Sequence, residues 1–118
     1  MMENESSEIK ISGRDMLITQ QLMDDIHQWA STTFPHQNSF SKIAHLQDEI
    51  NEVKEALNNH CKDEIKEEIA DCFILLYNLA SLNDMSAKDL YLEVKKKMEV
   101  NKSRHWGNPD EKGVCHHI

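Results

Sequence analysis

Residues 67–76 read EEIADCFILL, and this mixed acidic and apolar stretch decides the predicted fold. A helix that runs from Ile69 to Leu82 is apolar on nearly every side, which is typical of a buried helix. Glu68 and Asp71 lie three residues apart near its start, in a row that otherwise carries leucines. Without a partner, two carboxylates would be costly in such surroundings. The stretch therefore predicts a packed helix that holds a cation.

A second acidic run precedes it, because residues 45–53 read HLQDEINEV. Its apolar residues recur at steps of three and four, the spacing of a packed helix seam: Ile43, Leu46, Ile50, Val53 and Leu57. Glu49 and Glu52 lie in one row beside this seam. If the two helices are neighbours, Glu49, Glu52, Glu68 and Asp71 can converge as hard oxygen ligands, which Mg²⁺ prefers.

The composition favours an all-α fold in a single domain. The chain has 118 residues, 39% apolar and 29% charged, with three Gly and two Pro, which suits helices joined by short loops. We expect residues 1–12 to be a flexible lead-in and residues 13–118 to form one helical domain with an irregular tail from about residue 105. Four helices of this length cannot enclose an all-apolar helix, so we expect an antiparallel bundle completed by dimerisation.

Capping and periodicity place the helices. They predict helices over 13–31, over 39–59 with Ser39 as N-cap, over 63–82, and a fourth from Ser86. The short connection around residue 60 predicts that the second and third helices pack as an antiparallel hairpin.

One row of the fourth helix changes character along its length. It begins with Leu90 and Val94, which we expect in the core, and continues with Lys97, Asn101 and Arg104. An ammonium, an amide and a guanidinium in this order suit a polyphosphate ligand.

Charge and cysteine usage exclude several classes of protein. The formal net charge of −8 lacks the basic footprint that a nucleic-acid polymer requires. Three cysteines without CxxC spacing indicate a reducing compartment, and no signal segment or membrane-spanning run is visible, so we expect a cytoplasmic protein. Cys115, His116 and His117 lack a second ligand cluster, and we interpret them as an ordinary terminus rather than a zinc site.

At these motifs the chain resembles the MazG-like, all-α nucleoside triphosphate pyrophosphohydrolases, whose pattern is EExxE followed by ExxD. Here the pattern reads DEINE at 48–52 and EIAD at 68–71, with Asp48 where the family usually has Glu. Lys97 and Asn101 match the family's downstream Lys and Asn. The residues Trp29, Phe34-Pro35 and the run NKSRHW at 101–106 are similar to the branch of dATP/dGTP pyrophosphohydrolases, found in phages and bacteria.

The resemblance implies hydrolysis between the α and β phosphates of a nucleoside triphosphate, giving a monophosphate and pyrophosphate. It implies Mg²⁺, or Mn²⁺ in its place, held by Glu49, Glu52, Glu68 and Asp71, with Glu49 or Glu52 also accepting a proton. Lys97 and Arg104 would stabilise the pyrophosphate and Asn101 would orient it. The expected substrate is a purine deoxynucleotide, dGTP or dATP, with Trp29, Phe34 and Trp106 as candidates to contact the base.

Two other readings of the acidic residues were open. A non-catalytic helical module with an acidic face for a basic partner does not explain acids in the most apolar helix. A di-iron bundle requires Glu-x-x-His pairs, which neither acidic motif contains. The sequence leaves open the base and sugar preference, the number of metal ions, the identity of the general base, and whether the assembly is a homodimer or a dimer of dimers.

Overall fold

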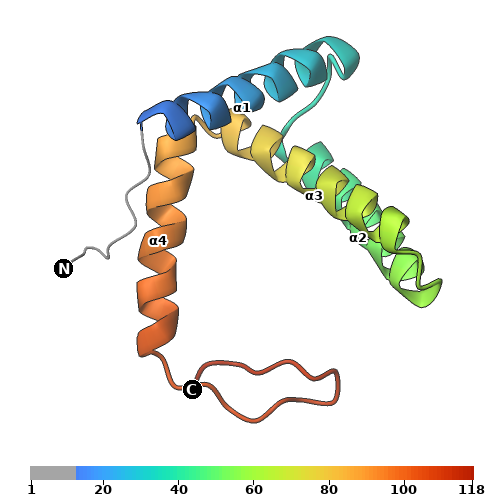
Figure 1. Cartoon of the computed structure of the whole chain (residues 1–118), viewed down its shortest axis with the longest axis vertical. Helices are drawn as coiled ribbons and strands as arrows, with labels where there is room; N and C mark the ends of the chain where they lie inside the picture. The colour runs from blue at the N-terminus through green and yellow to red at the C-terminus, as the bar shows by residue number, and fades with distance from the viewer. Residues whose placement is uncertain (1–12) are drawn as a thin grey trace. The chain divides into compact units, whose positions relative to one another are not determined.

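The computed structural model describes residues 13–118, and these form four α-helices with no β-sheet (Figure 1). In chain order they are α1 (Gly13–Thr33), α2 (Ser39–Asn58), α3 (Lys62–Leu82) and α4 (Ala87–Ser103). The predicted all-α class is confirmed, and the observed ends lie within two residues of the predicted ones. The predicted lead-in over 1–12 lies outside the described residues.

Helix α2 begins with a reciprocal cap, although not at the predicted residue. The Asn38 side chain accepts a hydrogen bond from the Ser41 backbone N–H at 2.9 Å, and Ser41 Oγ accepts one from the Asn38 N–H at 2.9 Å. The prediction of Ser39 as N-cap was wrong, because Asn38 has the extended backbone of a cap (φ −149°, ψ 176°) and Ser39 already belongs to the helix.

Helices α2 and α3 both end without glycine. His60 and Asp84 adopt the left-handed conformation, with φ of 54° and 61°. The next backbone N–H then bonds back into each helix, from Cys61 to Ala56 O at 3.4 Å and from Met85 to Ala80 O at 3.0 Å. These C-terminal motifs reverse the chain sharply, at the expense of a left-handed backbone at residues that have a Cβ.

The chain divides into two compact units, and the first contains residues 13–88 of the described chain. In this unit α2 and α3 form the predicted antiparallel hairpin, and α1 packs against α3. Asn83 Nδ2 donates to Ser39 Oγ at 3.1 Å, joining the end of α3 to the start of α2. Small residues let the helices approach closely, and the buried apolar side chains are Met23, Ile26, Ala30, Ala56, Leu75, Ala80 and Ala87.

Much of the expected core is exposed in a single chain. Ile69, Phe73 and Leu76 of α3 are 42–52% exposed, in keeping with the expectation that the helices of one chain cannot enclose this helix. The reason is that α1 and α2 cover only part of α3 within this unit. Ile43, Ile50 and Leu57, from the predicted seam of α2, are similarly exposed.

The second unit contains Asp89–Ile118, which are most of α4 and the tail. Because α4 is the only helix of this unit, Val94 is 55% exposed, which corrects the expectation that it lies in a core. After the helix the tail closes on itself. Gly107 N–H donates to His116 O, and Ile118 N–H donates to His105 O, each at 2.8 Å, around a bridge between Trp106 and His117.

Asp110 organises the tip of this tail. Its Oδ1 accepts hydrogen bonds from the Lys112 and Val114 N–H groups at 2.9 Å each, and its Oδ2 lies 3.1 Å from His116 Nε2. These donors lower the pKa of the Asp110 carboxyl below its ordinary value. The tail is therefore an ordered loop rather than a frayed end.

Among the described helices, none is long and apolar enough to cross a membrane.

Candidate functional site

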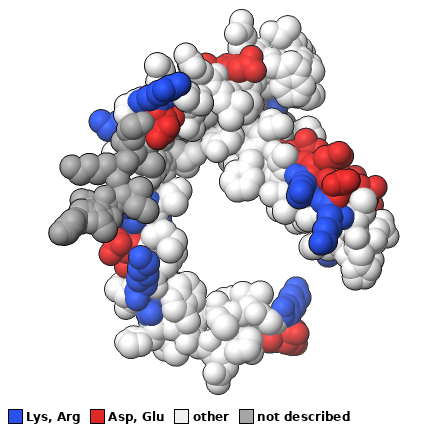
Figure 2. All heavy atoms as spheres, in the orientation of Figure 1, with Lys and Arg blue, Asp and Glu red and all other residues white. Residues whose placement is uncertain are grey.

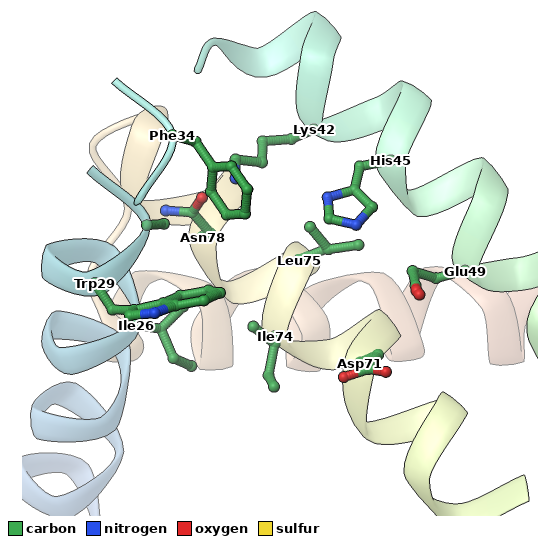
Figure 3. Close-up of a pocket in the computed structure, with 11 residues that line it drawn as sticks. Ile26, Trp29, Phe34, Lys42, His45, Glu49, Asp71, Ile74, Leu75 and Asn78 are labelled. Atoms are coloured by element: carbon green, nitrogen blue, oxygen red, sulfur yellow. The ribbon is translucent and has the colours of Figure 1, made fainter. Parts of the chain in front are cut away.

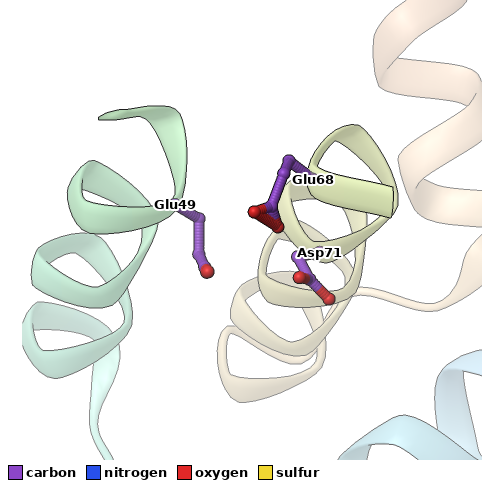
Figure 4. A group of neighbouring side chains, drawn as sticks. All are labelled: Glu49, Glu68 and Asp71. Carbon is purple, nitrogen blue, oxygen red and sulfur yellow. The ribbon is translucent and has the colours of Figure 1, made fainter. Parts of the chain in front are cut away.

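Three of the four predicted metal ligands converge between α2 and α3. One carboxylate oxygen each from Glu49, Glu68 and Asp71 lies within 4.8 Å of the other two (Figure 4). Glu49 comes from α2, whereas Glu68 and Asp71 come from adjacent turns of α3, because residues three apart share a face. Pairing α2 with α3 as a hairpin brings these two faces together.

The fourth predicted ligand, Glu52, lies outside this group of three but close enough to act on it. The pKa of Glu68 is raised to about 7, first by partial burial, then by a hydrogen bond to Asp71 and the charges of Glu52 and Glu49. Burial and the charges of Glu49, Asp71 and Glu68 also raise the pKa of the Cys72 thiol. Two different groups therefore report a strongly negative potential at this point of the hairpin.

No basic side chain among residues 13–118 lies within ion-pair distance of the acidic cluster, by which we mean Glu49, Glu52, Glu68 and Asp71. The surrounding sequence adds to the excess charge, because residues 48–71 contain nine acidic residues and three lysines. Figure 2 shows acidic side chains gathered over the α2–α3 hairpin. An uncompensated set of oxygen donors of this kind fits a divalent cation, which would supply the missing positive charge.

A pocket of about 220 Å³ opens beside the acidic cluster, and Glu49 and Asp71 contribute to its lining (Figure 3). Apolar side chains from α1 and α3 form part of its wall: Ile26, Ala30, Ile74 and Leu75. Further polar groups come from Lys42, His45 and Asn78. An apolar pocket with few polar groups, next to a set of carboxylates, suits a ligand with a flat apolar part and an anionic part.

Two of the three predicted base-contact residues, Trp29 and Phe34, line this pocket. Their ring centroids are 5.5 Å apart and their planes are 87° apart. A flat base stacked on one ring therefore meets the other ring edge-on, so at most one of them can stack. Trp29 is 53% exposed, which leaves part of its indole free for contact.

The remaining predicted site residues belong to the second unit, which is described by itself. Lys97 is exposed on α4, whereas Asn101 and Arg104 are half-buried. Trp106 donates from Nε1 to Asn101 O at 3.0 Å, and its ring makes an edge contact with His117. The tail thus holds the Trp106 indole against the end of α4.

Comparison with known proteins gives the family. The family model of the dATP/dGTP pyrophosphohydrolases matches residues 22–118. The chain belongs to this family. It is accordingly a nucleotide pyrophosphohydrolase, a hydrolase that acts on phosphoric anhydrides, as the acidic motifs indicated.

A solved structure supports the same assignment. The cyanophage S-2L MazG-like pyrophosphohydrolase, bound to dGDP and three catalytic Mn²⁺ ions per active site, matches with a TM-score of 0.63 and 26% sequence identity. The match covers 83% of this chain and 94% of that one, so the MazG-like fold is confirmed. No curated protein matches this family member in sequence.

Sequence reasoning did not assign a site role to three polar residues of the pocket, Lys42, His45 and Asn78. For Lys42 and Asn78 a signal was present in their spacing. Lys42 precedes Glu49 by seven residues on α2, and Asn78 follows Asp71 by seven residues on α3. Two helical turns separate each pair, so each member shares a face with an acid of the cluster.

Proposed function

We propose that this family member hydrolyses a purine deoxynucleoside triphosphate, dGTP or dATP, between the α and β phosphates, releasing the monophosphate and pyrophosphate. One observation carries the proposal: three convergent, unneutralised carboxylates stand at one end of a pocket with an aromatic wall. The dGDP and Mn²⁺ ions held by the cyanophage relative support the same combination of ligands.

The carboxylates of the acidic cluster would hold the metal, Mg²⁺ or Mn²⁺ in its place. When bound, a divalent cation supplies positive charge to the phosphoryl oxygens and acidifies water for attack at phosphorus. The donor set fits this role, because the oxygens of Glu49, Glu68 and Asp71 lie within 4.8 Å of one another and have no ion-pair partner among residues 13–118. Glu52 raises the pKa of Glu68 and completes the set.

Glu49 or Glu52 would take the proton from the attacking water as a general base. The other charged groups would act on the phosphates. Lys97 and Arg104 would donate to the oxygens of the leaving pyrophosphate, and the Asn101 amide would orient it.

The base would enter the pocket beside Trp29 and Phe34. Because these rings are nearly perpendicular, the base would stack on one of them, and Trp29 is the better candidate given its exposure. Trp106 remains a further candidate from the second unit.

We also propose that the active form is a homodimer or a dimer of dimers. Ile43, Ile50 and Leu57 recur every seven residues on α2 and are 41–52% exposed, which is the spacing of a helix–helix seam. An apolar row of this kind on a surface indicates a partner helix, and a second copy with two-fold symmetry supplies one. Sedimentation at low micromolar concentration tests this, and a stable monomer with full activity would contradict it.

The function is tested by incubating the purified protein with each canonical nucleoside triphosphate in Mg²⁺ or Mn²⁺. We expect the deoxynucleoside monophosphate and pyrophosphate in equal amounts, no inorganic phosphate, and no reaction in EDTA. In H₂¹⁸O the label should enter the monophosphate if water attacks the α phosphorus. Release of inorganic phosphate, or a panel without any cleavage, would contradict the proposal.

A further inference from the structure

Asn78 presents a buried hydrogen-bond acceptor without a partner at the wall of the pocket. The residue is 1% exposed, and its Oδ1 is buried and makes no hydrogen bond within the described chain. A buried amide oxygen left in this state is energetically unfavourable. Because Asn78 lines the pocket beside the acidic cluster, a ligand there can supply the missing donor.

His27 fixes the orientation of this amide. Asn78 Nδ2 lies 3.1 Å from His27 Nδ1, across α1 and α3. An amide NH₂ group only donates, so His27 Nδ1 is the acceptor and the imidazole carries its proton on Nε2. With Nδ2 engaged in this way, Oδ1 is the atom that remains for a ligand.

Lys42 adds a donor to the same pocket. It is 4% exposed, and its Nζ lies 4.4 Å from the centroid of the Phe34 ring. None of the hydrogen bonds or ion pairs of residues 13–118 involves Nζ, and burial lowers the pKa of this ammonium. The Phe34 ring offsets part of the cost of burying the side chain, and Nζ is left able to donate to a ligand in the pocket.

The two groups lie together and away from the acids. Figure 3 shows Lys42 Nζ and the Asn78 amide beside Phe34, with Glu49 and Asp71 at the other end of the pocket. A ligand that spans the pocket with its anionic part at the carboxylates therefore presents its far edge to one donor and one acceptor.

We propose that Asn78 and Lys42 read the Watson–Crick edge of guanine, with Lys42 Nζ donating to O6 and Asn78 Oδ1 accepting from N1–H and the 2-amino group. His27 acts as a positioning residue, since it holds the amide in this orientation. The inference rests on the proposed function, because it assumes that the ligand of the acidic cluster is a nucleotide.

Guanine fits this pair of groups better than adenine. Its edge carries a carbonyl oxygen next to two donors, which matches one ammonium and one amide oxygen with two lone pairs. Adenine offers one amine and one ring nitrogen, so it gives Oδ1 fewer donors and gives Lys42 no carbonyl. Sites that hydrogen-bond a substrate group discriminate strongly against analogues that lack it.

The test measures kcat/KM for dGTP and dATP, and calorimetric Kd for dGDP and dADP with Mn²⁺, on the full chain. We expect wild type to favour guanine, and Asn78→Leu and Lys42→Met each to reduce the guanine-to-adenine ratio about tenfold or more. Asn78→Asp keeps an acceptor of the same shape, which His27 can hold by donating from Nδ1–H in its other tautomer, so the ratio should stay within about threefold of wild type. If the guanine-to-adenine ratio falls in Asn78→Leu but is kept in Asn78→Asp, Asn78 recognises the base and does not merely support the structure.

Gln37 provides a matched control. Its Oε1 is also buried without a hydrogen bond among the described residues, but Gln37 lines an adjoining hollow next to Pro35 and His36 and is not part of the lining of the pocket that contains Asn78. Gln37→Met should therefore leave the ratio unchanged. The analogue 7-deaza-dGTP, which keeps the Watson–Crick edge and lacks N7, should be used as well as dGTP.

The outcomes separate this inference from the proposed function. An equal loss for both bases in Asn78→Leu and Lys42→Met, or an unchanged ratio, overturns the inference while cleavage of the triphosphates still supports the proposed function. Poor use of 7-deaza-dGTP overturns the choice of edge. If no triphosphate is cleaved, the proposed function fails, and the ratio of the Kd values for dGDP and dADP still decides whether Asn78 and Lys42 read the base.

Discussion

Glu68 and Asp110 are both carboxylates on the surface of helical units, and their surroundings shift their pKa values in opposite directions. The pKa of Glu68 is raised to about 7 by partial burial and by acidic neighbours. The pKa of Asp110 is lowered by the Val114 and Lys112 N–H groups and by His116. One carboxylate lacks any positive partner among the described residues, and the other is fully supplied with donors.

The difference separates a site from a structural support. The hydrogen-bond donors around Asp110 favour its charged form, and the same hydrogen bonds order the loop at 110–116. The surroundings of Glu68 disfavour its ionised form. A protein tolerates such a carboxylate where a bound ligand compensates its charge. We therefore expect function to depend on Glu68 and local order to depend on Asp110.

The largest expected effect is on turnover. Glu68→Gln, Glu52→Gln and Asp71→Asn should each lower kcat/KM by about a hundredfold or more, because an amide keeps the shape of a ligand but not its charge. Circular dichroism should show unchanged helicity. Glu67→Gln, the neighbouring exposed acid outside the cluster, is the matched control and should stay near wild type. Near-normal activity in all three cluster variants would place the metal elsewhere.

The second effect is a pH dependence of metal affinity. A proton competes with the metal at Glu68 below its pKa of about 7, so calorimetric affinity for Mn²⁺ should fall about tenfold between pH 8 and pH 6. Proton release on binding should be visible as a dependence of the measured enthalpy on the buffer. In Glu68→Gln the remaining pH dependence over this range should be much smaller. Equal slopes in both proteins would contradict this assignment.

The third effect is the pH dependence of folding stability, which has opposite signs for Glu68 and Asp110. The folded state binds the Glu68 proton more tightly than the unfolded chain, so without metal stability falls as pH rises from the ordinary carboxyl value to about 7. In EDTA at pH 8, Glu68→Gln should therefore raise the melting temperature.

For Asp110 the sign is reversed. Its lowered pKa gives stability that is present above the ordinary carboxyl pKa and lost as pH falls through the lower folded value. Asp110→Asn at pH 8 should accelerate hydrogen exchange at the Lys112 and Val114 amides, whose partner is Asp110 Oδ1. Protection that is unchanged in this variant would remove the contrast between the two carboxylates.

The smallest expected effect is a gain in folding stability from a substitution that leaves every carboxylate unchanged. His60→Gly relieves the left-handed backbone at the end of α2 (φ 54°) and should stabilise the protein by about 0.5–1 kcal/mol, measured by urea unfolding. The hairpin that carries the acidic cluster would then be more stable with the cluster intact. The affinity for Mn²⁺ should not change in His60→Gly. A change in this affinity as large as that in Glu68→Gln would show that the stability of the hairpin, rather than its charge, controls metal binding.

The helix pattern was predictable because it is local. Turn and cap residues around 32–38, 58–62 and 83–86 bracket each helix, and the observed ends lie within two residues of those expected. The N-cap of α2 was misplaced by one residue, since Asn38 and Ser39 are both good caps and only the backbone conformation distinguishes them. The exposure of α3 in a single chain agrees with the expectation that one chain cannot enclose this helix, and its coverage by a second copy stays a prediction.

The sequence by itself determined the four helices, the acidic motifs and the resemblance to a family that the comparison then established. These follow from residue type and from the period of the helix, which fixes the direction of each side chain around its own axis. Only the tertiary structure decided that Glu49 meets Glu68 and Asp71 while Glu52 stays beside them, and that His27, Lys42 and Asn78 share one pocket region. The period says nothing about which faces of two helices meet, because the packing of α1, α2 and α3 depends on side chains far apart in the chain.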